Sequence, residues 1–250
     1  MFFDCECILG KPPLPMTDIT PDLPDLLNQM SKLHIDKALV RSRVCLSDSA
    51  ELGNQVLLKD INGHDNLIPA FFVTNDGLHG EWKPGVMVDS LLSSGAKAAW
   101  VQDPYGGIPY ILETWCAGEM LDALQQHKVP LMLNASQVSP GILHDLLTDF
   151  PTLPVILLQV PRMGRIPHVY RLMQLHTNLH ICVGASYGVH LGIEDLVNNF
   201  GSSRLIFGSG YPTPEGGMPV AMLMYAQISD ADKAAIASAN MERLISEVLV

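Results

Sequence analysis

The sequence predicts a single (β/α)8 barrel, the TIM-barrel fold of the α/β class, as one domain over residues 1–250. Short apolar runs rich in β-formers recur about every 25 to 35 residues, and each is followed by a stretch with helical spacing. Eight such units in a chain of 250 residues match the usual size of this barrel. An open doubly wound sheet is the alternative, but no GxGxxG or GxxxxGK[ST] motif follows any of the runs.

The first four predicted strands cover residues 2–9, 37–44, 67–73 and 96–102. The helix after the first is expected to open at Thr20 with Pro21 in its first turn. The helices after the next three are expected near 49–60, 84–94 and 110–127.

The first strand carries both acidic side chains and thiols. Because side chains alternate along a strand, Asp4, Glu6 and Ile8 should share one face, with Cys5 and Cys7 on the other. With Glu6 pointing into the barrel, the two cysteines should face the helices, and Asp4 should be a structural hydrogen-bonding residue on the barrel floor.

The remaining strands are predicted at residues 130–135, 154–159, 178–184 and 204–210. The helix after the fifth strand should begin near Ser139 and Pro140, where a capping hydroxyl precedes a first-turn proline. Helical sequence continues beyond the eighth strand, enough for the last barrel helix and an extra C-terminal helix.

Composition limits the partners and the compartment. The chain has 15 Lys and Arg against 26 Asp and Glu, a formal charge of −11, so nucleic acid is not an expected partner. The apolar runs have strand length, and no membrane interaction is expected. The five cysteines are scattered without a CxxC pair, and the segment MFFDCEC does not resemble a signal peptide, so we expect a cytoplasmic protein.

Three segments resemble a known family. FDCECILG (3–10) is similar to an opening strand D-x-H-x-H-x-G, LIFGSGYP (205–212) to an eighth-strand end G-S-D-Y/W-P, and ANMERLI (239–245) to a closing helix with an N-A-x-R-L pattern. These are features of the amidohydrolase-related family of metal-dependent hydrolases and decarboxylases. The resemblance implies an active site at the C-terminal ends of the strands.

The positions that hold the metal in that family differ here. The two histidines of the family's first strand correspond to Glu6 and Ile8, and its eighth-strand aspartate corresponds to Gly210. The fifth and sixth strands end in Asn134 and Gln159, whose neutral amides are poor ligands for a transition metal. We therefore expect neither a bound metal nor another cofactor.

Glu6 is the predicted catalytic residue, because desolvation inside a barrel raises a carboxyl pKa toward the range useful for acid–base work. An ion pair with Arg41, Arg43 or Arg162 is an equally open interpretation. The predicted substrate-binding residues are polar side chains at strand ends: Arg41, Asn134, Gln159, Arg162, Ser209 and Tyr211.

These residues predict a barrel that binds a small polar or anionic organic molecule. The resemblance implies hydrolysis of a C–O or C–N bond, or decarboxylation. The alternative is a catalytically inactive scaffold or ligand sensor. A homo-oligomer formed through the methionine-rich segment 218–226 is a further open interpretation, since methionine serves equally as core filler.

Overall fold

The computed structural model describes residues 1–12, 21–74, 83–104, 110–161, 166–213 and 217–250. Eight parallel strands pair in sequence order, which confirms the predicted barrel. They are β1 (Phe3–Leu9), β2 (Lys37–Ser42), β3 (Leu67–Phe72), β4 (Ala98–Trp100), β5 (Leu131–Asn134), β6 (Val155–Leu158), β7 (Leu179–Val183) and β8 (Leu205–Phe207).

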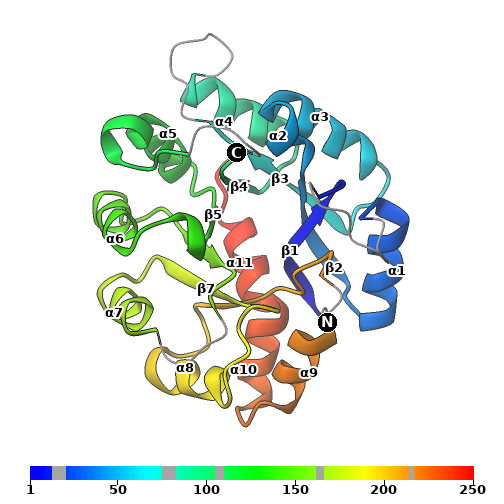
Figure 1. Ribbon diagram of the computed structural model, residues 1–250, viewed down its shortest axis with the longest axis vertical. Coiled ribbons are helices and arrows are strands. Elements are labelled where there is room, and N and C mark those ends of the chain that lie inside the picture. Colours follow the sequence, from blue (N-terminus) through cyan, green and yellow to red (C-terminus); the bar gives the residue numbers. More distant parts are fainter. Residues whose placement is uncertain (13–20, 75–82, 105–109, 162–165, 214–216) are drawn as a thin grey trace.

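Helices surround the strands (Figure 1). They are α1 (Leu23–Leu33), α2 (Val44–Ser47), α3 (Ala50–Asp60), α4 (Pro84–Ser93), α5 (Thr114–Gln126), α6 (Pro140–Asp149), α7 (Pro167–Leu175), α8 (Gly192–Phe200) and α9 (Gly217–Tyr225). The Ser139 side chain caps α6 as predicted. The prediction for the first helix was wrong: α1 is capped by Asp22, whose carboxylate accepts from the Asp25 N–H, and the proline in its first turn is Pro24 and not Pro21. Thr20 lies outside the described residues.

Two apolar clusters fill the molecule. The larger lies between the strands and the surrounding helices, and includes alternate strand residues such as Leu133, Ile181 and Phe207. The smaller fills the barrel interior and includes Phe3, Trp100 and Ile206. Alternation along each strand divides its side chains between the two clusters, so polar groups inside the barrel are set in an apolar interior.

The first strand departs from regular alternation. Asp4 pairs with Ala38 and Cys7 with Val40, so β1 uses one residue more than β2 over this interval. This β-bulge turns both Cys5 and Glu6 toward the interior, where Cys5 joins the inner cluster and Glu6 contacts Cys182. The prediction that Cys5 faces the helices was therefore wrong, whereas Cys7 does belong to the outer cluster.

Asp4 joins the first and last strands. Its carboxylate accepts hydrogen bonds from the backbone N–H groups of Glu6 and Ser209, each at 2.9 Å, and from the Cys7 thiol at 3.1 Å. The Ile8 N–H donates to the Tyr211 carbonyl across the same seam. Asp4 is thus structural as expected, but it holds the seam near the end of β8 and does not lie on the barrel floor.

The C-terminal segment covers the end of the barrel at which the strands begin, which we call the barrel floor. It comprises α10 (Asp230–Ala234), the π-helix η3 (Ala235–Ala239) and α11 (Asn240–Ser246). Figure 1 shows α11 in red across the middle of the ring. Met241 and Leu244 of α11 enter the inner cluster. The predicted extra helix therefore closes the barrel floor.

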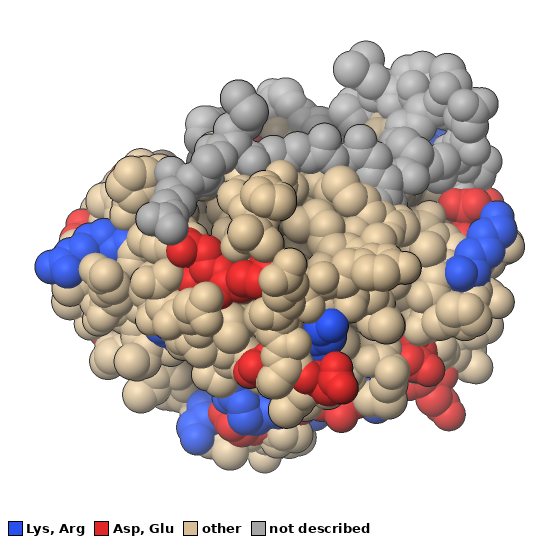
Figure 2. Space-filling model, turned by 90° about the horizontal axis from the view of Figure 1, so that it is seen from below, with Lys and Arg blue, Asp and Glu red and all other residues tan. Residues whose placement is uncertain are grey.

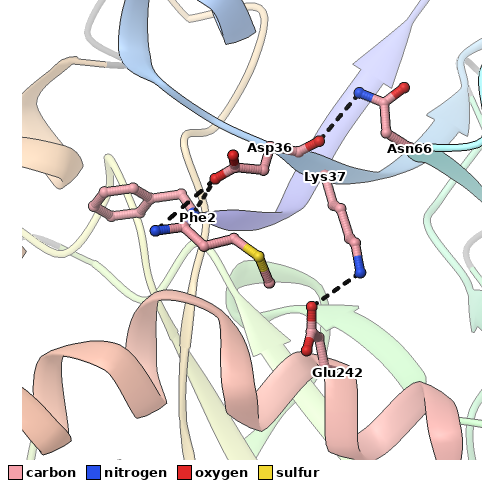
Figure 3. Close-up of polar contacts among 6 residues, drawn as sticks. Phe2, Asp36, Lys37, Asn66 and Glu242 are labelled. Atoms are coloured by element: carbon pink, nitrogen blue, oxygen red, sulfur yellow. Dashed lines mark hydrogen bonds and ion pairs between the residues drawn. The ribbon is translucent and has the colours of Figure 1, made fainter.

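Polar contacts connect the strands and the closing helix at this floor (Figure 3). The Asp36 side chain accepts from the Phe2 N–H at 2.7 Å, and the Asp36 carbonyl accepts from Asn66 Nδ2 at 3.1 Å. Lys37 forms an ion pair with Glu242 of α11 at 3.0 Å. These contacts tie the N-terminal ends of three strands to one another and to the closing helix.

The outer surface carries charges of both signs. Figure 2 views the side that includes α8 to α10, and the charged side chains of its described part are scattered in small groups among uncharged ones. In the segment proposed as an oligomer contact, Met224 and Tyr225 are exposed and Leu223 is buried. None of the described helices has the length and apolar character needed to span a membrane.

Candidate functional site

The predicted site residues that the structure describes come from the C-terminal ends of the strands. Arg41 and Asn134 are buried at the ends of β2 and β5, Glu6 is buried in the middle of β1, and Gln159 is exposed directly after β6. Arg162 lies outside the described residues. The end of a (β/α)8 barrel at which these residues meet is the one that carries the active site in enzymes of this fold.

Glycines make room for the Glu6 carboxyl. A Cβ atom at Gly184 would lie 2.7 Å from Glu6 Oε2, and one at Gly208 would lie 3.2 Å from the same oxygen. Any larger residue at either position would displace the carboxyl. The Cys182 thiol donates to Oε2 at 3.5 Å, and Cys5 Sγ lies 3.6 Å from Cys182 Sγ. The carboxyl therefore occupies a fixed place between β1, β7 and β8.

The environment favours the protonated form of Glu6. Burial raises its pKa above the ordinary value, and the negative charge of Asp4 adds to that rise. The positive charge of Arg41 opposes the shift, as do hydrogen bonds from Cys182 and Gln159. Among the described residues no arginine forms an ion pair with Glu6. The Glu6 carboxyl thus loses its proton at a higher pH than an exposed glutamate does.

Gln159 has an unusual backbone conformation. Its φ angle is +52°, in the left-handed region that residues other than glycine seldom occupy. Such strain is found most often where a side chain must be held in a functional position. Here the backbone places the Gln159 amide within hydrogen-bonding reach of the Glu6 carboxyl.

Arg41 presents buried donors. Only 3% of the residue is exposed, and its guanidinium lies over the Trp100 ring, 5.4 Å from the ring centre. Within the described part of the chain, Arg41 Nε and Trp100 Nε1 are buried without a hydrogen-bond partner. Buried donors are rarely left unpaired, so two together indicate a place for an acceptor.

The β4–β5 side of the barrel mouth carries further polar groups. Of these the sequence analysis singled out Asn134 but not Gln102, Asp103 or Tyr110. Asn134 Nδ2 donates to Gln102 Oε1 at 3.1 Å, and the Tyr110 N–H donates to Asp103 at 2.7 Å. Asn134 Oδ1 and the Tyr110 hydroxyl are buried, and neither has a partner among the described residues. Burial also raises the pKa of Tyr110, so its hydroxyl stays protonated.

Ser209 and Tyr211 are placed differently from the others. The Ser209 hydroxyl accepts from the Tyr211 N–H at 3.1 Å, within the turn after β8. The Tyr211 hydroxyl reaches α1, where it bonds the Asp25 carboxylate at 3.1 Å and the Asp22 carbonyl at 3.2 Å. The Tyr211 hydroxyl is thus engaged with α1, and a role of Tyr211 in substrate binding stays a prediction. The structure brings neither hydroxyl to the Glu6 carboxyl.

Apart from Glu6, the residues at the family's metal positions do not fit a transition metal. Ile8 is part of the apolar inner cluster, Gly210 has no side chain, and Asn134 and Gln159 offer neutral amides. Over the part of the chain that the structure describes, no three His, Cys, Asp or Glu side chains converge so that they could hold a metal ion.

Comparison with known proteins agrees with this architecture. The family model described as amidohydrolase matches residues 94–245, more than half of the chain. The protein is thus a (β/α)8 barrel that belongs to the amidohydrolase family. No curated protein sequence matches it significantly.

Solved structures share its fold at low sequence identity. A 2,6-dihydroxybenzoate decarboxylase from Rhizobium is 14% identical, with a TM-score of 0.75 over 98% of each chain. A probable 2-pyrone-4,6-dicarboxylic acid hydrolase from Acinetobacter baumannii, with citric acid bound, is 14% identical, with a TM-score of 0.72 over 98% of this chain and 99% of that one. A dihydroxybenzoic acid decarboxylase from Polaromonas, with bound manganese and the inhibitor 2-nitroresorcinol, is 12% identical, with a TM-score of 0.73 over 98% and 96%.

Proposed function

We propose that this protein binds a small polar or anionic organic molecule at the C-terminal end of the barrel, without a metal ion, and exchanges a proton with it through Glu6. The observation that carries the proposal is the buried Glu6 carboxyl with raised pKa in the same barrel mouth as the unpaired donors of Arg41 and Trp100. An acceptor group of the ligand, such as a carboxylate, satisfies those donors. Glu6 then lies beside the part of the ligand that reacts.

Two reaction classes suit a single acid–base group. In a decarboxylation, Glu6 gives its proton to the carbon atom that loses CO2 and regains a proton from solvent. In the hydrolysis of a C–O or C–N bond, the Glu6 carboxylate takes a proton from the attacking water and returns it to the leaving atom. The cation of Arg41 stabilises negative charge that develops on the ligand in either reaction. The similarity to decarboxylases and to a probable hydrolase supports this choice of classes.

A ligand sensor or an inactive scaffold is the second candidate, and a specific observation favours it. Only 3% of Glu6 is exposed, and the aromatic rings of Phe72, Trp100 and Tyr110 pack edge to face beside the mouth. Aromatic side chains packed in this way leave a substrate less access to Glu6 than an enzyme requires.

A thermal-shift screen of small carboxylic acids and lactones tests the proposal, with Glu6→Gln as the matched variant and elemental analysis of the same preparation. We expect at least one compound to raise Tm in the wild type, a smaller effect in Glu6→Gln, and less than stoichiometric zinc, manganese and iron. Product analysis of the stabilising compounds separates an enzyme from a sensor. Stoichiometric metal refutes the metal-independent site, and stabilisation by no compound favours the scaffold.

A further inference from the structure

A small pocket lies between the C-terminal ends of β4 and β5. Its polar lining consists of Gln102, Asp103, Tyr110, Asn134 and Gln137, over an apolar base that includes Leu133. Gln137 comes from the short helix η2 (Ala135–Gln137) that follows β5. The space admits about one water-sized group. Whatever enters is therefore a single small group, not a whole ligand.

The groups that face this pocket are mainly acceptors. Asn134 Nδ2 is engaged by Gln102, which leaves Asn134 Oδ1 buried and unpaired. Gln137 Oε1 and the Tyr110 hydroxyl are buried as well, and neither has a partner within the described residues. A cluster of unpaired acceptors calls for a group that donates several hydrogen bonds at once.

Charge narrows the choice of that group. Asp103 adds a carboxylate to the lining, and none of the ion pairs among the described residues includes it. A hydroxyl donates one hydrogen bond and carries no charge, whereas a primary ammonium group donates three and is positively charged. The three donors of the ammonium group match the three unpaired acceptors, and its positive charge complements the Asp103 carboxylate.

We propose that the pocket of Asp103, Tyr110, Asn134 and Gln137 is a subsite for the primary ammonium group of a small organic ligand. The inference deepens the proposed function and rests on it, because the rest of the ligand would lie in the barrel mouth with its carboxylate at Arg41 and Trp100. The ligand class is then a small amino acid whose two charged groups are recognised at separate places. The subsite selects this class over simple carboxylic acids.

Paired ligands test the subsite. Isothermal titration compares glycine, β-alanine, 4-aminobutanoate and 5-aminopentanoate with acetate, propanoate, butanoate and pentanoate, so that each amino acid has a partner of equal chain length without the amine. We expect at least one amino acid to bind at least tenfold more tightly than its partner. Asp103→Asn should remove that difference, since the amide can still accept from the Tyr110 N–H but carries no charge. Asp145→Asn, the same change at an exposed position of α6, should leave it intact.

A second measurement isolates the subsite from the barrel mouth. Methylammonium chloride should raise Tm more than sodium or potassium chloride at equal ionic strength, and Asp103→Asn should abolish the excess. No excess over sodium means that the pocket holds only water and overturns the inference. An equal effect of potassium assigns the pocket to a metal cation and also overturns it.

The two experiments separate this inference from the proposed function. If carboxylic acids bind in a Glu6-dependent manner while the amine brings no gain, the proposed function stands and the subsite is wrong. If methylammonium binds through Asp103 while no acid binds, the subsite stands and the proposed function is wrong.

Discussion

The two ends of this barrel differ in how often their buried polar groups are paired. At the floor, Asn240 Nδ2 donates to the carbonyls of Ser202 and Leu205 at 2.8 and 2.9 Å, and Arg204 donates to those of Met173 and His176 at 2.8 Å. At the C-terminal end, Arg41, Trp100, Tyr110 and Asn134 each retain a buried polar atom with no partner among the described residues.

The difference supports the proposal that the floor stabilises the fold and that the C-terminal end binds the ligand. Buried groups that satisfy one another hold a fold together, whereas unpaired ones destabilise it unless something else pairs with them. In barrels of this kind the C-terminal face carries function and the N-terminal face stability. Substitutions at the floor should therefore lower stability, and those at the other end should chiefly change ligand binding.

The largest expected effect comes from two buried asparagines. Asn240→Leu loses two hydrogen bonds, one of them to the carbonyl of the buried Leu205, so it should lower the free energy of unfolding by about 2 to 4 kcal/mol. Asn134→Leu loses the single hydrogen bond to the half-buried Gln102 and removes the unpaired Oδ1, so it should cost about 1 kcal/mol or less. Urea denaturation measures both. Equal losses at the two positions would show that the two ends do not differ.

The next effect depends on pH and tests His180 of β7, one of two residues toward the floor, with Ser238, that have an unpaired buried atom among the described residues. Its Nδ1 is buried without a partner among the described residues. Burial lowers its pKa from 6.5 to about 3, with further lowering by Arg243 and Arg204. Below pH 6.5 the unfolded chain binds a proton that the folded chain does not, so His180 destabilises the protein progressively as the pH falls toward 3.

Between pH 7 and pH 5 this loss should amount to about 2 kcal/mol, from the 1.36 kcal/mol that each pKa unit represents. His180→Leu should remove that part of the pH dependence, and His168→Leu, at an exposed position of α7, should not. Urea denaturation at the two pH values checks this. An unchanged difference in His180→Leu would mean that His180 is not the neutral buried group described here.

The overall architecture could be predicted from the sequence because it follows from local signals. Alternating apolar runs and helical stretches gave all eight strands in order, and a serine before a proline marked the start of α6. Such signals act within a few residues and depend on backbone geometry and burial alone.

The details of the site could not be predicted because they depend on contacts between distant residues. The bulge that turns Cys5 inward is fixed by the register with β2, and the Glu6 carboxyl is placed by Cys182 and two glycines more than 170 residues away. Alternation alone assigns Cys5 to the wrong face. The Tyr211 hydroxyl likewise finds a partner on α1, which strand position does not reveal.

The smallest expected effect has the opposite sign and concerns Glu6. Its pKa in the folded protein is raised above the ordinary value of 4.5, so the unfolded chain loses its proton first as the pH rises. The contribution of Glu6 to stability is therefore present below pH 4.5 and is lost as the pH rises through its folded pKa. Glu6→Gln cannot ionise and should be more stable than the wild type at pH 7, as is usual when a functional group held at a cost in stability is replaced.

The advantage of Glu6→Gln should shrink as the pH falls toward 4.5, whereas that of His180→Leu should grow over the same range. Thermal and urea denaturation of both variants from pH 4.5 to 7.5 test this crossing. If Glu6→Gln is instead less stable than the wild type at pH 7, the ionised carboxylate is a structural partner of Arg41, and the C-terminal end, like the floor, is held together by its own polar groups. A gain at neutral pH that accompanies the loss of ligand binding would show that the fold gives up stability here to keep an acid available to the ligand.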